Sequence, residues 1–350
     1  MRFLIIIFLL AVVSVTAAGL YTYNWLDSPL SLHTVKDENN LDELSSAFVV
    51  KPGSSLTQVS NQLANQGYFK YPKILSVYGR LMKKTNIKVG EYSVLAIDTP
   101  KTLLGKFIDG DVIVYSVTLV EGKTFKEVLK HLQSQKKVRV ELTDESQIDQ
   151  FVSNLNIEEQ HPEGWFFPDT YQYSLGVSDK TILRQAHQRM KDVLATEWEG
   201  RSENLPYKTP YEALIMASIV ERETGQVSER EEIAGVFVRR LQKKMRLQTD
   251  PTIIYGLGDA YDGNIRRRHL SQKTPYNTYV INGLPPTPIA LPGREAIYAA
   301  LHPDDGKALY FVAKGDGSHQ FSETLKDHNK AVLEYQINRR KKDYQSAPKK

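Results

Sequence analysis

The pattern of apolar and polar positions is most regular between residues 209 and 258, where it predicts two helices and then a polar loop. Thr209 can cap the first helix, Glu212 completes a T-x-x-E capping box with it, and Gly225 can end the helix. The run from Leu214 to Val220 is apolar almost all round. A helix that is apolar on nearly every side is buried, so we expect this one to be central to a domain.

A second capping box, from Ser228 to Glu231, predicts the start of the next helix. Apolar residues then recur at helical spacing, and the end of the helix is strongly basic. The apolar positions are Ile233, Val236, Phe237 and Leu241, and the basic cluster consists of Arg239, Arg240, Lys243, Lys244 and Arg246. The following segment, Gln248 to Thr252, is expected to be a rigid polar loop, a kind of segment that often carries functional residues.

The N-terminus contains a separate apolar segment. No charge occurs between Arg2 and Asp27, and Phe3 to Leu26 would span about 36 Å as a helix at 1.5 Å per residue. Acidic residues dominate the stretch that follows, so the positive-inside rule places the N-terminus in the cytoplasm and the body of the chain outside. A cleaved signal peptide is the alternative, because Thr16 to Gly19 are small residues. The apolar run continues well past them, which favours an uncleaved single-pass anchor.

A polar linker at 27–46 leads into a pattern that occurs twice, at 49–63 and at 118–132. Each copy predicts a strand, a tight turn at glycine and a capped helix. The capping boxes run from Ser55 to Gln58 and from Thr124 to Glu127.

The first copy continues through a second predicted helix, Pro72 to Met82, and returns as a strand at Gly90 to Val94. This β-α-α-β order, with the opening VVKPGSSLTQVSNQLANQGYF, resembles a LysM module, a small fold that binds polymers containing N-acetylglucosamine. The alternative is a generic β-α unit that only packs against the main domain.

Aromatic and turn residues are concentrated between residues 161 and 171. Aromatic side chains such as Trp165 and Phe166 could stack on sugar rings. Glu163 and Asp169 would then be polar partners. The alternative is a buried aromatic corner, which is the commoner use of such residues.

The remaining elements are expected to be scaffold. A helical pattern opens just after Asp179 and runs to about Glu197. Arg294 to Leu301 predicts a short helix. Leu309 to Ala313 and His319 to Phe321 predict the strands of a hairpin, and a final helix is expected from Ser322 onward.

Composition excludes several kinds of chemistry. At 350 residues, with 41% hydrophobic and 25% charged residues, the chain is an ordinary globular protein of two or three domains. The net charge of +4 is too diffuse to indicate nucleic-acid binding. The absence of cysteine excludes disulfides, thiolate nucleophiles and cysteine-ligated metals. The eight histidines lack metal-ligand spacing, and nucleotide-binding and hydrolase motifs are absent, so we predict no metal and no cofactor.

Glu221 is the leading candidate for chemistry. At about 100° per residue it shares a helix face with Leu214, Ala217 and Ser218, while Glu223 points to nearly the opposite side. A carboxyl group at the end of an apolar run is partly desolvated, which favours its protonated form and suits a general acid. The alternative is an ordinary glutamate that faces solvent in the last turn of its helix.

Several motifs together resemble the YceG-like family of endolytic murein transglycosylases. They are ASIVERET followed by SER, then VFVRRL, MRLQTDPTIIYGLG, TPYNTY, GLPPTPIALPG, YFVAKGDGSHQF and EGWFFPDTY. The resemblance spans nearly the whole chain. It implies that Glu221 is the catalytic residue. It also implies candidate substrate-binding residues in the matching motifs, namely Glu163, Ser218, Gln248, Thr249, Asp250, Tyr255 and Asn277.

The reaction implied by the resemblance is non-hydrolytic cleavage of peptidoglycan between N-acetylmuramic acid and N-acetylglucosamine. Glu221 would protonate the glycosidic oxygen and then accept the proton of the muramoyl C6 hydroxyl, which attacks to form a 1,6-anhydro ring. The enzyme would act on nascent strands from the bacterial inner membrane, with its catalytic body in the periplasm, and would end strand elongation. Peptidoglycan synthases are the expected partners.

Two other functions remain open. A lysozyme-type muramidase would use Glu223 or Asp250 as a second carboxylate, and the orientation of Glu223 away from Glu221 counts against that residue. An anchored, non-enzymatic peptidoglycan-binding protein would use only the LysM-like module.

The expected fold class is α+β. It comprises a transmembrane helix at 1–26, the linker at 27–46, a small LysM-like β-α-α-β module at 47–112, a larger mixed α/β catalytic domain of the YceG-like type at 113–338 and a basic tail at 339–350.

Overall fold

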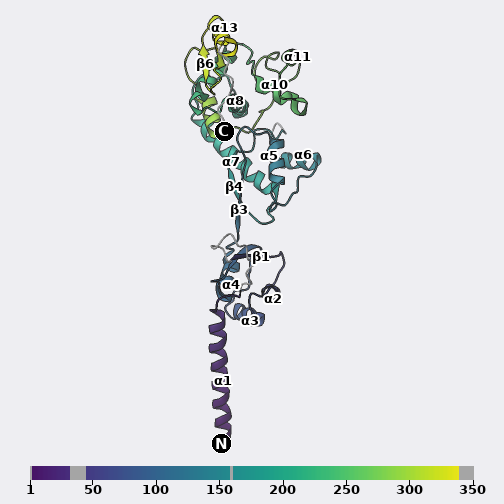
Figure 1. Ribbon diagram of the computed structural model, residues 1–350, viewed down its shortest axis with the longest axis vertical. Helices are drawn as coiled ribbons and strands as arrows, with labels where there is room; N and C mark the ends of the chain where they lie inside the picture. Colours follow the sequence, from purple (N-terminus) through teal and green to yellow (C-terminus); the bar gives the residue numbers. More distant parts are fainter. Residues whose placement is uncertain (1, 32–44, 158–160, 339–350) are drawn as a thin grey trace. The chain divides into compact units, whose positions relative to one another are not determined.

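A computed structural model describes residues 2–31, 45–157 and 161–338 of the chain (Figure 1). It is a mixed α/β protein with two compact units. Unit 1 comprises Met1–Tyr115 and Gln172–Gly176, and unit 2 comprises Ser116–Tyr171 and Val177–Lys350. The mixed α/β class is therefore confirmed. The basic tail and most of the predicted linker lie outside the described residues.

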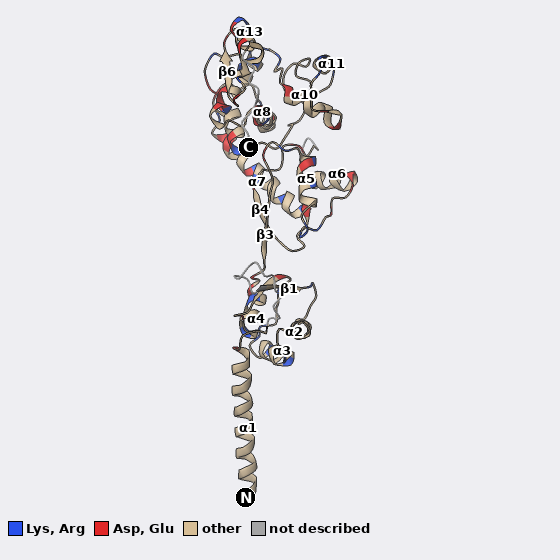
Figure 2. Ribbon diagram, in the orientation of Figure 1, with Lys and Arg blue, Asp and Glu red and all other residues tan. Residues whose placement is uncertain are grey.

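Unit 1 begins with the predicted apolar helix, α1 (Arg2–Leu26). Its Phe3–Leu26 stretch has a mean hydropathy of 2.8 in its most apolar window. That stretch carries no charged residue (Figure 2). The helix is long and apolar enough to cross a membrane.

The rest of unit 1 is built on a two-stranded antiparallel sheet. The strands pair from Ser45↔Leu95 to Val50↔Gly90. Alternate residues of the first strand, Phe48 and Val50, are buried, as expected for a sheet with one face on a core. The elements are β1 (Ser45–Val50), α2 (Leu56–Asn65), α3 (Pro72–Leu81), β2 (Gly90–Leu95) and α4 (Pro100–Asp109). The β-α-α-β order is thus confirmed, while α4 was not predicted.

Unit 2 is organised around α8 (Pro210–Glu223), whose residues from Ala213 to Glu221 are all buried. The prediction of a central helix is confirmed. Its immediate neighbours are α7 (Asp179–Glu199), α9 (Arg230–Gln242), α10 (Asp250–Leu257) and α12 (Arg294–Leu301). Together their apolar faces make up the core of this unit.

Short elements complete unit 2 and the boundary between the units. A hairpin of β5 (Tyr310–Ala313) and β6 (His319–Ser322) pairs from Tyr310↔Ser322 to Ala313↔His319, as predicted. The others are β3 (Val114–Thr118) paired with β4 (Thr170–Ser174), α5 (Phe125–Gln133), α6 (Glu145–Asn154), α11 (Arg267–Ser271), α13 (Leu325–Val332), 3-10 turns η1 (Val227–Glu229) and η2 (Gly258–Ala260), and a π-helical turn η3 (Leu333–Asn338).

Local capping signals account for most helix starts. The predicted capping boxes at Ser55 and Thr124 are both formed, and Ser178 and Thr209 cap α7 and α8. The predicted box at Ser228 is wrong. Helix α9 begins at Arg230 after the η1 turn, because the carboxylate of Glu229 accepts hydrogen bonds from the backbone and ring of a residue in β6.

Other boundaries also differ from the prediction. Helix α8 is capped at its C-terminus by Thr224 in an extended conformation, not by Gly225. The strand predicted at the start of the second copy of the repeat comes earlier than expected: β3 ends at Thr118, and Leu119 and Val120 lie outside it. The predicted polar loop after Gln248 contains helix α10, which Pro251 starts in its first turn.

Candidate active site

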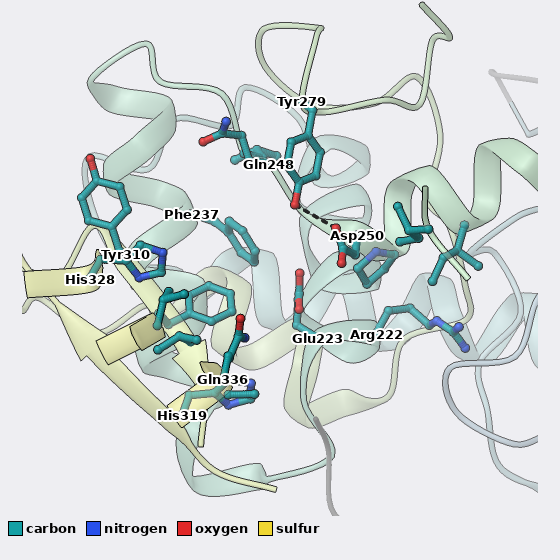
Figure 3. A pocket seen from close by; sticks show the side chains of 18 of the residues that line it. Arg222, Glu223, Phe237, Gln248, Asp250, Tyr279, Tyr310, His319, His328 and Gln336 are labelled. Atoms are coloured by element: carbon teal, nitrogen blue, oxygen red, sulfur yellow. Dashed lines mark hydrogen bonds between the residues drawn. The ribbon is translucent and has the colours of Figure 1, made fainter. Parts of the chain in front are cut away.

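Unit 2 contains a cavity of about 810 Å³, and Glu223 at the C-terminal end of α8 lies in its wall (Figure 3). The walls come from elements far apart in the sequence. Phe237 and Arg240 belong to α9, and Asp250 begins α10. The opposite wall is formed by residues of β5, β6, α13 and η3, including Tyr310, His319, His328 and Gln336.

Glu223 is held in the wall by a hydrogen bond from the Thr249 hydroxyl to its Oε1. Desolvation raises the pKa of Glu223 to about 7, and the negative charge of Asp250 acts in the same direction. The Thr249 hydrogen bond and the positive charge of Arg240 lower the pKa and oppose this shift. Near neutral pH this carboxyl group is therefore present in both its protonated and its ionised form.

A second carboxylate shares the cavity. The Tyr279 hydroxyl donates a hydrogen bond of 2.8 Å to Asp250 Oδ1, and Figure 3 shows this pair beside Glu223. Burial raises the pKa of Tyr279, and the charge of Asp250 raises it further, so the phenol remains a hydrogen-bond donor. Gln248 also lines the cavity, in a left-handed conformation with φ of 52°. Such a conformation is uncommon for a residue other than glycine and is often found at functional sites.

Arg240 joins two walls of the cavity. Its guanidinium group donates hydrogen bonds of 2.7 Å to the carbonyl oxygens of Leu309 and Leu247. It also lies 5.1 Å from the centre of the Tyr310 ring. These contacts connect the chain before β5 with the segment that leads to Gln248, so one side chain positions both.

His319 is oriented by an acidic neighbour. Glu229 accepts a hydrogen bond of 3.0 Å from the His319 backbone N–H, and its Oε2 lies 2.8 Å from Nδ1 of the ring. His319 therefore adds a fixed polar group to the wall of the cavity.

Glu221, the predicted catalytic residue, lies in the last turn of α8, two residues before Glu223. Its side chain is 2% exposed, so the expected desolvation is confirmed and the solvent-facing alternative is wrong. Its Oε1 lies 3.4 Å from the buried guanidinium group of Arg230, and its Oε2 accepts a 3.2 Å hydrogen bond from the Gly293 backbone. Glu221 is not among the residues that line the cavity of Glu223. Its geometry is that of a buried ion pair.

The predicted substrate-binding residues fall into three groups. Gln248 and Asp250 line the cavity, and Thr249 contacts Glu223. Ser218 and Asn277 instead hold backbone segments. The Ser218 hydroxyl donates to Ile215 O and accepts from Ile289 N, and Asn277 Nδ2 donates to His269 O at 2.9 Å and to Gln272 O at 2.7 Å.

Glu163 and Tyr255 form a buried pair. The Tyr255 hydroxyl donates to Glu163 Oε2 at 3.1 Å, and the backbone N–H of Phe125 donates to Oε1 at 2.9 Å. Burial raises the pKa of Glu163 to about 7. Neighbouring Phe166 is fully buried and stacks on Phe125 with ring centres 5.0 Å apart, so the buried aromatic corner is confirmed for this side chain.

Several cavity residues were not predicted from the sequence. Tyr279 lies within the quoted TPYNTY motif, and His319 lies within YFVAKGDGSHQF, so the motifs contained a signal for both. Arg240 was interpreted only as part of a basic helix end. In the described residues, no group of three or more histidine or acidic residues is placed to hold a metal ion.

Comparison with known proteins identifies the class. The chain matches the YceG-like family over residues 48–334 and therefore belongs to that family. It is 32% identical to the endolytic murein transglycosylase of Bacillus subtilis, over 82% of this chain and 83% of that protein. It is 27% identical to the protein of the same name from Streptococcus pneumoniae D39, over 95% of this chain and 65% of that protein.

A crystal structure of a yceG-like protein from Listeria monocytogenes matches with a TM-score of 0.53 and 29% identity. The match covers 82% of this chain and 98% of that structure. The resemblance noted from the sequence motifs is therefore confirmed by both sequence and fold.

Proposed function

We propose that this chain is a lytic transglycosylase that cleaves peptidoglycan between N-acetylmuramic acid and N-acetylglucosamine and leaves 1,6-anhydro-muramic acid ends. The observation that carries this proposal is the carboxyl group of Glu223, which lies in the wall of a large cavity with a pKa raised to about 7. A general acid works best when its pKa is near the working pH. The names of the Bacillus and Streptococcus relatives support the substrate and the type of cleavage.

In this mechanism the protonated Glu223 donates its proton to the glycosidic oxygen as the bond to the muramoyl C1 breaks. The resulting carboxylate then accepts the proton of the muramoyl C6 hydroxyl, whose oxygen attacks C1 to close the anhydro ring. The hydrogen bond from Thr249 stabilises the carboxylate between the two steps. One residue thus serves as acid and as base, and the reaction consumes no water.

The geometry favours Glu223 over Glu221 for this role. Glu221 is already paired with Arg230 and with the Gly293 backbone. Glu223 has no arginine contact of that kind in the described residues, and it faces the space that a glycan strand could enter.

Asp250 keeps a hydrolytic reaction of the lysozyme type as the second candidate. Both Asp250 and Glu223 line the same cavity, and hydrolysis requires two carboxyl groups, one of them acting on water or on C1. The products distinguish the two reactions, because transglycosylation leaves anhydro ends and hydrolysis leaves reducing ends.

The location and partners follow from the N-terminal helix. We infer that α1 anchors the enzyme in the bacterial inner membrane by a single span, with the catalytic body in the periplasm. Cleavage would then be restricted to nascent strands near the bilayer and would end their elongation. Peptidoglycan synthases are the partners that such a location favours.

We also infer that the chain is divided functionally into a LysM-like module at 47–112 and a catalytic domain at 113–338. The antiparallel β1–β2 pair and the two helices between its strands support the module. In this interpretation the module binds N-acetylglucosamine residues of the strand being cut.

The decisive experiment compares two variants of the full chain. Purified sacculi are digested with the wild-type protein, with E223Q and with E221Q, and the released fragments are identified by mass spectrometry. We expect anhydro-muramic ends from the wild type, and a loss of about 10²- to 10⁴-fold in rate for E223Q, the range for removing a general acid. E221Q should retain cleavage in proportion to the protein that remains folded.

The alternatives give different results. Loss of cleavage by folded E221Q, with activity retained in E223Q, would restore the assignment based on the sequence motifs. Reducing ends in place of anhydro ends would identify a muramidase. A wild-type protein that binds sacculi without releasing fragments would be a non-enzymatic glycan-binding protein.

A further inference from the structure

Helix α3 of unit 1 lies beside the C-terminal end of α1, as Figure 1 shows. Aromatic contacts connect the two. The Tyr21 hydroxyl lies 3.4 Å from the Tyr71 hydroxyl at the start of α3, and the Trp25 ring packs edge-to-face on Phe69 and Tyr71 at 5.5 and 6.0 Å between centres. Tyrosine and tryptophan at the end of an apolar span mark the level of the lipid headgroups. With α1 as the membrane span, the start of α3 would lie at that level.

The chain around α3 carries charge of one sign. Residues 44–90 contain seven Lys or Arg and no Asp or Glu. Figure 2 shows basic residues at α3 and none along Phe3–Leu26. Within the described part of the chain, no ion pair is found for the four exposed lysines next to α3, Lys70, Lys73, Lys83 and Lys84. Their charge is therefore free to act on a partner.

The same surface exposes large apolar side chains. Val77 and Leu81 of α3 are 51% and 76% exposed, and Met82, which follows the helix, is 53% exposed. Lys73, Val77 and Leu81 recur at intervals of four and therefore share one face of the helix. Surface apolar residues mixed with lysines are typical of a helix that lies in a lipid interface, with its apolar side chains below the headgroups and its ammonium groups among them.

We propose that this surface of α3 and the residues that follow it, defined by Lys73, Val77, Leu81, Lys83 and Lys84, lies in the headgroup layer of the membrane that α1 spans. The chemical partner is the anionic phospholipid headgroup together with the adjacent acyl chains. This proposal rests on the anchoring role assigned to α1 in the proposed function. It adds a second, reversible contact that fixes the orientation of unit 1 on the bilayer, where a single helix would leave the unit free to tilt.

Charge and continuity with the anchor both favour lipid as the partner. Anionic lipids attract basic segments close to the surface, and this attraction falls off within a Debye length, so it acts only on groups held next to the bilayer. The α1–α3 contacts hold them there. The Asp27–Lys101 ion pair of 3.1 Å also holds the N-terminal end of α4 beside α1. The other end of α4, at Asp109, is about 13 Å from that N-terminal end along the helix axis.

The natural chain has no cysteine, so single-cysteine variants of the full chain can be spin-labelled without background. Labels at L81C, at D109C and at V12C in α1 are compared in vesicles of phosphatidylcholine alone and of equal parts phosphatidylcholine and phosphatidylglycerol. Collision with oxygen, which concentrates in lipid, and with a water-soluble nickel chelate reports the depth of each label. D109C is the matched control, because it is an exposed site of the same unit.

We expect V12C to lie in lipid in both kinds of vesicle and D109C to lie in water in both. L81C should lie in lipid in the vesicles that contain phosphatidylglycerol, with less contact in phosphatidylcholine alone. The charge reversal K73E/K83E/K84E in the L81C chain should move its label into water. None of these residues belongs to the cavity that contains Glu223.

The other outcomes are separable. A lipid-embedded V12C with an L81C label as accessible to the nickel chelate as D109C would overturn this proposal and leave the anchor intact. A water-exposed V12C would overturn the anchor itself. An L81C label that is equally deep in both lipids and unaffected by charge reversal would overturn the assignment to anionic headgroups.

Discussion

Glu221 and Glu223 lie only two residues apart, yet their surroundings give the two carboxyl groups different chemistry. Glu221 is fixed by Arg230 and by a backbone N–H, which is the environment of a structural ion pair. Glu223 is desolvated at the wall of a cavity and has one hydroxyl donor, Thr249, which is the environment of a tunable acid. The difference arises from position on the helix, because residues two apart point to opposite sides.

The pH dependence of cleavage should follow Glu223. The acid step needs the protonated form, and the pKa is raised to about 7, so kcat/KM should be maximal below pH 7 and fall as the pH rises through 7. The Thr249 hydrogen bond stabilises the ionised form and lowers this pKa. T249V removes the donor, so the decline should move to higher pH. Initial rates on soluble glycan strands, measured from pH 5 to pH 9 in steps of about one unit, would show this shift.

Thr170 provides a control for that series. Its hydroxyl pairs only with Thr118 among the hydrogen bonds found, and neither residue lines the cavity of Glu223. T170V should therefore leave the pH profile unchanged. A T249V profile that stays in place, or moves to lower pH, would contradict the assignment of the acid to Glu223.

The sequence predicted part of this site. Helical periodicity predicted the two glutamates on opposite sides of the helix, in agreement with their separate partners, and correctly predicted the desolvation of Glu221. It could not show which side faces a cavity, since the opposite wall comes from Tyr310, His319 and other residues much later in the chain. Apolar periodicity reports burial, and burial alone does not distinguish an ion pair from an acid.

At the level of elements, the Glu221–Arg230 contact joins the end of α8 to the start of α9. Both side chains are almost fully buried, at 2% and 6% exposed. Removing Glu221 leaves the buried Arg230 with only the half-exposed Glu295, 3.6 Å away, whereas removing both partners of a buried pair can be nearly neutral. We expect E221Q to lower the free energy of unfolding by on the order of 3 kcal/mol. The double variant E221Q/R230M should recover much of this loss.

Thermal and urea unfolding of the full chain in detergent measure these differences. E223Q is the matched control, because it removes a carboxyl group that carries a desolvation cost and should leave stability unchanged or slightly higher. An E221Q chain as stable as the wild type would show that the Arg230 contact contributes nothing to the fold.

Elements whose start is set locally could be predicted, and elements set by distant contacts could not. The hydroxyl caps at Ser55, Thr124 and Thr209 are hydrogen-bonded to the backbone as the sequence indicated. The start of α9 was misplaced because His319, some ninety residues later, holds Glu229. Helix α10 was missed because it has only eight residues and a short apolar run, which periodicity cannot distinguish from a loop.

At the level of the whole molecule, the apolar N-terminal helix is continuous with the core of unit 1. Leu26 at its end and Leu30 just after it are 5% and 7% exposed and pack in the same core as Phe48 and Phe107. A removable leader has no need for such contacts. They favour an anchor that remains attached, and they couple the position of unit 1 directly to the membrane.

The orientation of the chain across the membrane can be tested by labelling. Arg2 precedes the span and acidic residues follow it, so the N-terminus should be cytoplasmic and unit 1 external. In spheroplasts a membrane-impermeant maleimide should label D109C at once and should label F3C only after detergent lysis. The cysteine-free wild type provides the blank. Labelling of F3C in intact spheroplasts would reverse the topology, and a mature F3C chain that has lost its N-terminal mass would show that the segment is a cleaved signal after all.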